Sequence, residues 1–64
     1  MSAFETRSIV NNYGEKLTFE YSKSGNTVDV DIYADYKFAT FTMSKKQLEE
    51  LIEIAKEVRE SVFE

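Results

Sequence analysis

The chain has 64 residues and a formal net charge of −4, a length that supports one small core and excludes a two-domain enzyme. The negative charge opposes the phosphate neutralisation by which most nucleic-acid-binding proteins gain affinity, so no direct nucleic-acid binding is expected. The chain contains no His and no Cys, which removes the usual neutral-pH general base, the thiolate nucleophile, disulfides and nitrogen or sulfur metal ligands. We therefore expect a protein that is not an enzyme and needs no cofactor.

The amino-terminal residues carry neither the basic segment nor the apolar segment of a targeting signal. No apolar run approaches the ~20 residues of a membrane-spanning helix. We expect a cytoplasmic protein that does not associate with membranes. The predicted organisation is one α+β domain over residues 1–64, with strands within 3–43 and a helix over about 44–63.

The first strand is predicted within residues 4–10, where apolar and polar side chains do not alternate cleanly. Either an edge position in the sheet or a β-bulge would explain this mixture. Turn residues follow at 11–14 and 23–26, and each of these clusters contains a glycine expected to supply a positive φ angle. A third turn, expected to be an ordinary type I turn, is predicted at 34–37, where Asp35 can bond the backbone.

Three further strands are predicted from alternation with a period of two. One face is expected to carry apolar side chains at Leu17, Phe19, Tyr21, Val28, Val30, Ile32, Ala34, Ala39, Phe41 and Met43. The opposite face then carries Asp29, Asp31, Tyr33 and Phe38. With the other parity for the fourth strand, Phe38 would instead lie in the core.

The helix has the clearest start signal in the chain. Ser44 is a candidate N-cap with Gln47 as its capping-box partner, and Met43 and Leu48 occupy the positions of a hydrophobic staple. Apolar residues then recur at helical spacing, at Leu48, Leu51, Ile52, Ala55, Val58 and Val62. The predicted fold is an antiparallel meander of three to four strands with one carboxy-terminal amphipathic helix packed on one sheet face.

The charges of this helix oppose its macrodipole. Lys45 and Lys46 lie in the first turn, whereas Glu57, Glu60 and Glu64 lie in the last turns. Surface charges of this kind are tolerated because each misplaced charge costs little. Alternatively, the two lysines form a small basic spot and the glutamates a second acidic surface.

Alternate carboxylates at Asp29, Asp31 and Asp35 invite a calcium-binding interpretation. An EF-hand loop, however, requires an Asp or Asn where Tyr33 stands and a Gly where Ala34 stands. Paired carboxylates also hydrolyse glycosides, but such catalysis requires a substrate cleft. We expect neither a metal site nor catalysis.

Aromatic side chains accompany these acids and suggest a surface for a basic protein partner. The candidate contact residues are Asp29, Asp31, Tyr33, Asp35, Tyr36 and Phe38. The alternatives are a solvated strand face that keeps the protein soluble, and a cross-strand pair of Tyr33 and Phe38 that only shields the sheet.

A very short acidic α+β chain of this kind resembles the accessory proteins of bacteriophages, many of which bind and block a host factor. The resemblance implies a protein-binding inhibitor that occludes a basic or nucleic-acid-binding surface of its partner. The alternatives are a homo-oligomer that binds a small ligand such as a nucleotide, and a structural subunit of a larger assembly. Self-association is expected to be common in domains of this size that have neither a disulfide nor a structural metal.

Overall fold

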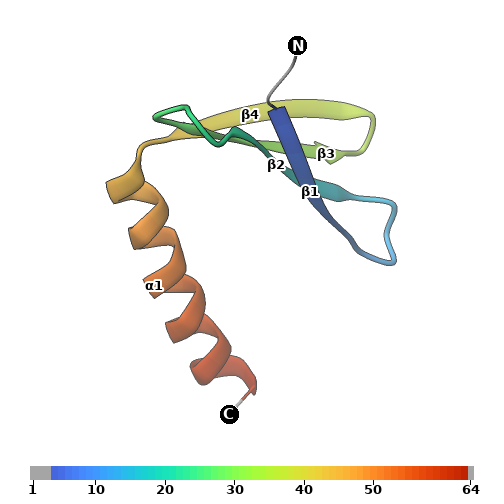
Figure 1. Cartoon of the computed structure of the whole chain (residues 1–64). Coiled ribbons are helices and arrows are strands. Elements are labelled where there is room, and N and C mark those ends of the chain that lie inside the picture. Colours follow the sequence, from blue (N-terminus) through green and yellow to red (C-terminus); the bar gives the residue numbers. More distant parts are fainter. Residues whose placement is uncertain (1–3, 64) are drawn as a thin grey trace.

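The chain folds as a four-stranded antiparallel meander followed by one carboxy-terminal helix (Figure 1). The computed structural model describes residues 4–63, so the expectations for residues 1–3 and Glu64 lie outside the described residues. The elements are β1 (Phe4–Val10), β2 (Lys16–Ser22), β3 (Val28–Ala34), β4 (Lys37–Met43) and α1 (Lys45–Phe63). This arrangement confirms the predicted α+β class.

Strand β1 lies at one edge of the sheet and β4 at the other, with the order β1-β2-β3-β4. The pairing of β1 with β2 runs without interruption from Phe4 opposite Ser22 to Val10 opposite Lys16. The mixed pattern of β1 therefore reflects an edge position, and the alternative of a bulge is wrong.

The β1–β2 turn is closed by the side chain of Asn11. Its Oδ1 accepts hydrogen bonds from the backbone N–H groups of Tyr13 at 2.9 Å and Glu15 at 3.1 Å, and its Nδ2 donates to Glu15 Oε1 at 2.7 Å. Gly14 has a φ of 77°, as expected for the glycine of a hairpin turn.

Two expectations about the other turns are wrong. Gly25 does not have a positive φ; its N–H donates to the Ser22 carbonyl at 2.9 Å, and an added Cβ would lie 3.3 Å from that oxygen. In the β3–β4 turn, Asp35 and Tyr36 have φ angles of 54° and 60°, which is the pattern of a type I′ turn and not of type I. A two-residue loop favours type I′ because its twist matches that of the flanking strands.

The inner face of the sheet carries the apolar residues that the alternation predicted. Phe19, Val30 and Phe41 form one cross-strand row, and Val28 lies opposite Met43 in the next. Among the described residues, Val30 and Met43 are the buried hydrophobic side chains. The predicted parity of β4 is therefore confirmed, but the buried core is very small.

The start of α1 is the predicted capping box. Ser44 Oγ accepts from the Gln47 N–H at 3.4 Å, and Gln47 Oε1 accepts from the Ser44 N–H at 3.0 Å. Met43, the residue before the cap, is only 3% exposed. The cap and the buried methionine together anchor the helix to the end of β4.

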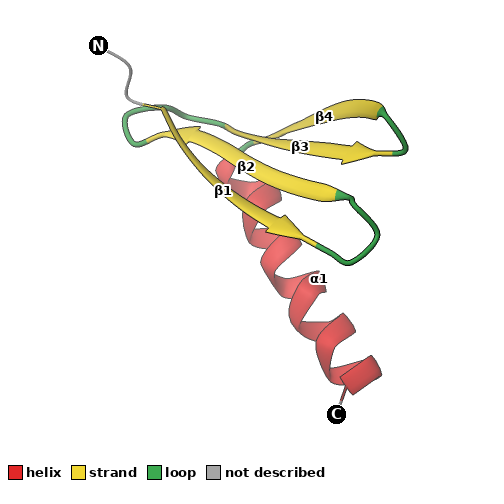
Figure 2. Cartoon of the chain, turned by 90° about the vertical axis from the view of Figure 1, so that its right-hand side faces the viewer, coloured by secondary structure: helices red, strands yellow, loops and turns green. Residues whose placement is uncertain are grey.

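Beyond this anchor, α1 leaves the sheet steeply on the inner side (Figures 1 and 2). Its main contact is with β4, and none of its described side chains is buried. Helix and sheet share an apolar lining only as far as Ala55. The helix is thus on the predicted side of the sheet, and its closest approach to the sheet is at its amino-terminal end.

Candidate functional site

The outer face of the sheet, opposite α1, carries most of the predicted contact residues. Asp29, Asp31 and Tyr33 alternate along β3, and Phe38 lies opposite Tyr33 on β4. Glu20 on β2 lies opposite Asp29 and adds a third carboxylate. We call this set of five residues the acidic face.

Threonine hydroxyls orient the two aspartates of the acidic face. Thr42 Oγ1 donates to Asp29 Oδ1 at 2.8 Å, and Thr40 Oγ1 donates to Asp31 Oδ1 at 2.8 Å. These bonds use one oxygen of each carboxylate and leave the second to solvent or to a partner. The strand repeat places the two carboxylates about 6.6 Å apart along β3, so the face presents two negative charges one after the other along the strand.

The aromatic pair lies beside this row. The rings of Tyr33 and Phe38 meet edge to face, with centroids 6.5 Å apart and planes inclined by 60°. The pair forms the cross-strand contact of the alternative in which these two rings only shield the sheet. It nevertheless leaves Phe38 66% exposed, so Phe38 is not in the core and its ring is accessible to a partner.

Asp35 and Tyr36 form the turn at the end of this face, directly beyond the pairing of Ala34 with Lys37. Tyr36 is 92% exposed and adopts a left-handed backbone conformation that a residue with a Cβ rarely takes. The structure therefore places four of the six predicted residues on one face and the other two at its rim.

Two further findings concern the residues that the structure describes. Within residues 4–63, no group of three or more acidic side chains is arranged to hold a metal ion. The helix in this part of the chain is not long and apolar enough to cross a membrane.

A second surface was not predicted. An open groove of about 580 Å³ lies between the inner face of the sheet and α1, lined by apolar side chains from all four strands and from the helix. Phe41 and Ile54 stand on its opposite walls and are 60% and 57% exposed. Among the described residues of the lining, Gln47 and Glu50 are the polar ones. We call this cavity the inner groove.

Ile54 was the signal in the sequence for this groove. The predicted apolar stripe contains Leu51, Ile52 and Ala55 but not Ile54. With Ile54 included, the apolar arc from Ile54 to Ile52 spans about 160° of the helix circumference, wider than the ~100° sufficient for one contact. Ile54 thus extends the apolar side of α1 to the lining of the inner groove.

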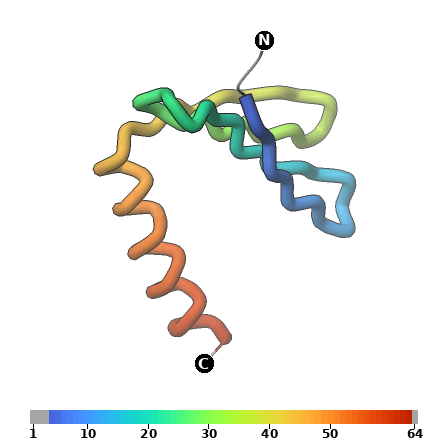
Figure 3. The backbone as a smooth tube through the Cα atoms, viewed as in Figure 1, coloured from blue at the N-terminus to red at the C-terminus, as the bar shows by residue number. Residues whose placement is uncertain are grey.

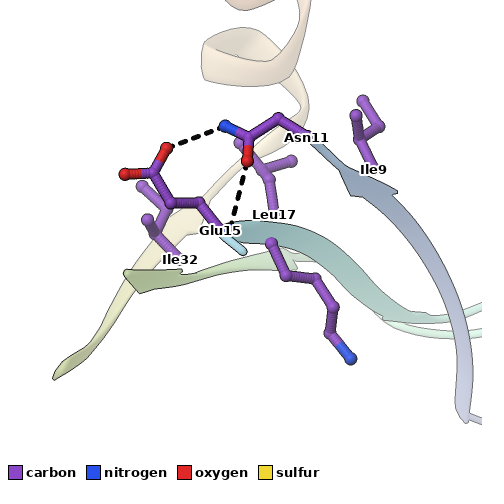
Figure 4. Close-up of a pocket in the computed structure, with 6 residues that line it drawn as sticks. Ile9, Asn11, Glu15, Leu17 and Ile32 are labelled. Carbon is purple, nitrogen blue, oxygen red and sulfur yellow. Dashed lines mark hydrogen bonds between the residues drawn. The ribbon is translucent and has the colours of Figure 1, made fainter. Parts of the chain in front are cut away.

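A smaller pocket of about 210 Å³ lies at the β1–β2 hairpin, where Ile9, Leu17 and Ile32 approach Asn11 and Glu15 (Figure 4). The polar groups of Asn11 and Glu15 are hydrogen-bonded to each other in the turn. This pocket, whose lining also includes Lys16, is therefore part of the hairpin structure.

Comparison with known proteins does not assign the chain to a group. The chain matches no protein-family model, no curated protein sequence and no solved structure.

Proposed function

We propose that this chain is a non-enzymatic protein-binding module, an inhibitor whose acidic face covers a basic or nucleic-acid-binding surface of a partner protein. One observation carries the proposal. Asp29 and Asp31 are held in a row by Thr42 and Thr40, next to the exposed ring of Phe38.

The chemistry of this face suits a cationic partner. Carboxylates spaced along a rigid strand attract a basic surface at long range and raise the association rate. Aromatic rings bury a large area with little loss of rotamer freedom, so Tyr33, Tyr36 and Phe38 would slow dissociation. The module would inhibit by competition, because a surface covered by the acidic face cannot bind phosphates.

A nucleotide-binding homo-oligomer is less well supported. The inner groove has an adequate volume for a small ligand. The described residues that line it include no Lys or Arg, and Glu50 would repel a phosphate.

The test is quantitative capture from a bacterial lysate. The wild-type protein is compared with Asp31→Lys/Tyr33→Ala, which reverses one charge and removes one ring of the acidic face. We expect specific proteins to be retained by the wild type and lost by the variant. A retained protein should then fail to bind nucleic acid in a fluorescence-polarisation assay when the wild-type chain is added.

Glu49→Lys/Tyr13→Ala is the matched control, since it makes the same chemical changes on the exposed helix surface and at the β1–β2 turn. This control should retain the same proteins as the wild type. Equal retention by Asp31→Lys/Tyr33→Ala would contradict the proposed contact surface. Capture that is lost equally in both variants would indicate non-specific attraction to negative charge.

A further inference from the structure

A single copy of this chain has a larger accessible surface and a larger radius of gyration than a typical folded protein of its mass. Its accessible surface is 5722 Å², whereas a folded monomer of 7.4 kDa exposes about 4,200 Å². Its radius of gyration is 13.4 Å, against about 11 Å for a compact chain of this length. The single chain therefore exposes about 1,500 Å² that a stable fold would cover.

The helix of the same chain is not positioned to cover this surface. Only Ser44 separates β4 from α1, and the backbone turns sharply there (Figure 3). Both capping hydrogen bonds, between Ser44 and Gln47, lie at this junction. In the position that this junction gives it, α1 leaves Phe41 and Ile54 60% and 57% exposed on the two sides of the inner groove, so the groove has room for a further occupant.

The chain itself carries a surface that fits the groove. The helix extends eight residues past Ala55, the last residue in the groove lining, which is about 12 Å of helix. Val58 and Val62 continue the apolar stripe along this extension and are exposed. One chain thus has an open apolar groove and an exposed apolar segment at the end of its helix. In a two-fold dimer, the helix end of each copy could contact the groove of the other.

The charge order along α1 favours an antiparallel arrangement of two helices. Its first turn contains Lys45 and Lys46 and no acid, and its last turn contains no base. Glu57 and Glu60 lie near the carboxy-terminal end. In an antiparallel pair, Lys45 and Lys46 of one helix lie at the level of the end of the other helix where Glu57 and Glu60 alternate with Lys56 and Arg59. The two macrodipoles are also opposed. The order of charges that opposes the macrodipole within one helix therefore favours an antiparallel pair of helices.

We propose that the inner groove is filled by the α1 helix of a second copy of this chain, in a two-fold dimer with antiparallel helices between two sheets. Covering the excess surface on both chains would bury about 3,000 Å², within the range of obligate homodimers. The acidic face lies on the opposite side of each sheet and stays exposed. Asp29 and Asp31 are therefore not pressed against their own copies, and the partner-binding proposal does not depend on the dimer.

The first measurement is the mass of the purified chain by sedimentation velocity and native mass spectrometry. A particle of twice 7.4 kDa at micromolar concentration is expected. A folded particle of single-chain mass would overturn the proposal, because it would mean that the chain's own helix or a different protein covers the groove. Any assembly larger than a dimer would also overturn it.

The second measurement uses two charge-reversed variants, Lys45→Glu/Lys46→Glu and Glu57→Lys/Glu60→Lys. All four side chains are exposed in the single chain. Each variant places like charges together at both ends of an antiparallel pair, so its dimer should dissociate about tenfold more readily at low salt. A mixture of the two variants restores opposite charges at both ends and should form mixed dimers in preference to either homodimer.

The two variants also distinguish the antiparallel dimer from effects of the charges within a single helix. Within an isolated helix, both sets of substitutions complement the macrodipole and should stabilise it. A control, Glu20→Lys/Asp31→Lys, changes the charge by the same amount as Glu57→Lys/Glu60→Lys but on the outer face, and should leave the dimer intact. Stabilised variants, or a mixture with no preference for mixed dimers, would overturn the antiparallel arrangement.

Discussion

The left-handed conformation of Tyr36 leads to a prediction in which stability and binding change in opposite directions. Tyr36 has a φ of 60°, and its side chain is 92% exposed. A residue with a Cβ in this region costs about 1–2 kcal/mol relative to its right-handed form. Replacing it by glycine removes this strain and loses almost no buried area.

The expected gain from Tyr36→Gly is below the full strain energy, because glycine loses more backbone entropy on folding, about 0.5–1 kcal/mol. We expect a net stabilisation of about 0.5–1 kcal/mol. In a domain of this size, that corresponds to an increase in Tm of about 2–8 °C. Binding to a basic partner should weaken at the same time, since the aromatic ring at the rim of the acidic face is lost.

Tyr36→Ala is the control, because it removes the ring but keeps the Cβ. The two variants should lose partner binding equally, while only glycine stabilises the fold. Urea denaturation followed by circular dichroism, at one fixed protein concentration, measures the difference. If alanine stabilises the chain as much as glycine, backbone strain at Tyr36 is not the cause and the reasoning is refuted.

Three further predictions concern the junction between β4 and α1 and the inner groove. Ser44→Ala removes the capping oxygen at the start of α1 and should destabilise the protein by about 1 kcal/mol in urea denaturation. Ser44→Thr keeps a hydroxyl and should retain most of the stability. Equal losses for both variants would show that the cap is not the stabilising group. Met43→Ala should cost about 2–5 kcal/mol because it empties a packed site. If the proposed dimer covers the inner groove, Phe41→Ala should cost a comparable amount, although Phe41 is 60% exposed in one chain. A loss below about 1 kcal/mol for Phe41→Ala would mean that nothing covers the inner groove.

Most of the sheet and the candidate site could be predicted from local patterns. The alternation of Asp29, Val30 and Asp31 assigns each side chain to a face, because successive residues of a strand point to opposite sides. Once Val30 is placed inside, the outward positions of Asp31 and Phe38 follow from register. The start of the helix was equally predictable, since the bonds between Ser44 and Gln47 connect residues three positions apart.

The turns were predicted less well. The type I′ conformation at Asp35 and Tyr36 has no glycine to signal it, and it is imposed by a two-residue loop between paired, twisted strands. The hydroxyl bonds from Thr40 and Thr42 to the aspartates also depend on the pairing of β3 with β4. Both features are consequences of register, which brings residues 9 and 13 positions apart into contact.

The sequence by itself determined the elements, the two faces of the sheet and the capped start of the helix, because these depend on periodicity and on contacts within one turn. Only the tertiary structure decided the direction in which α1 leaves the sheet. That direction follows from the junction at Ser44, where one capped residue and the buried Met43 connect β4 to the helix. The apolar stripe of α1 and the apolar face of the sheet are both evident in the sequence. Whether one covers the other within the same chain depends on the angle between them, which no local pattern encodes.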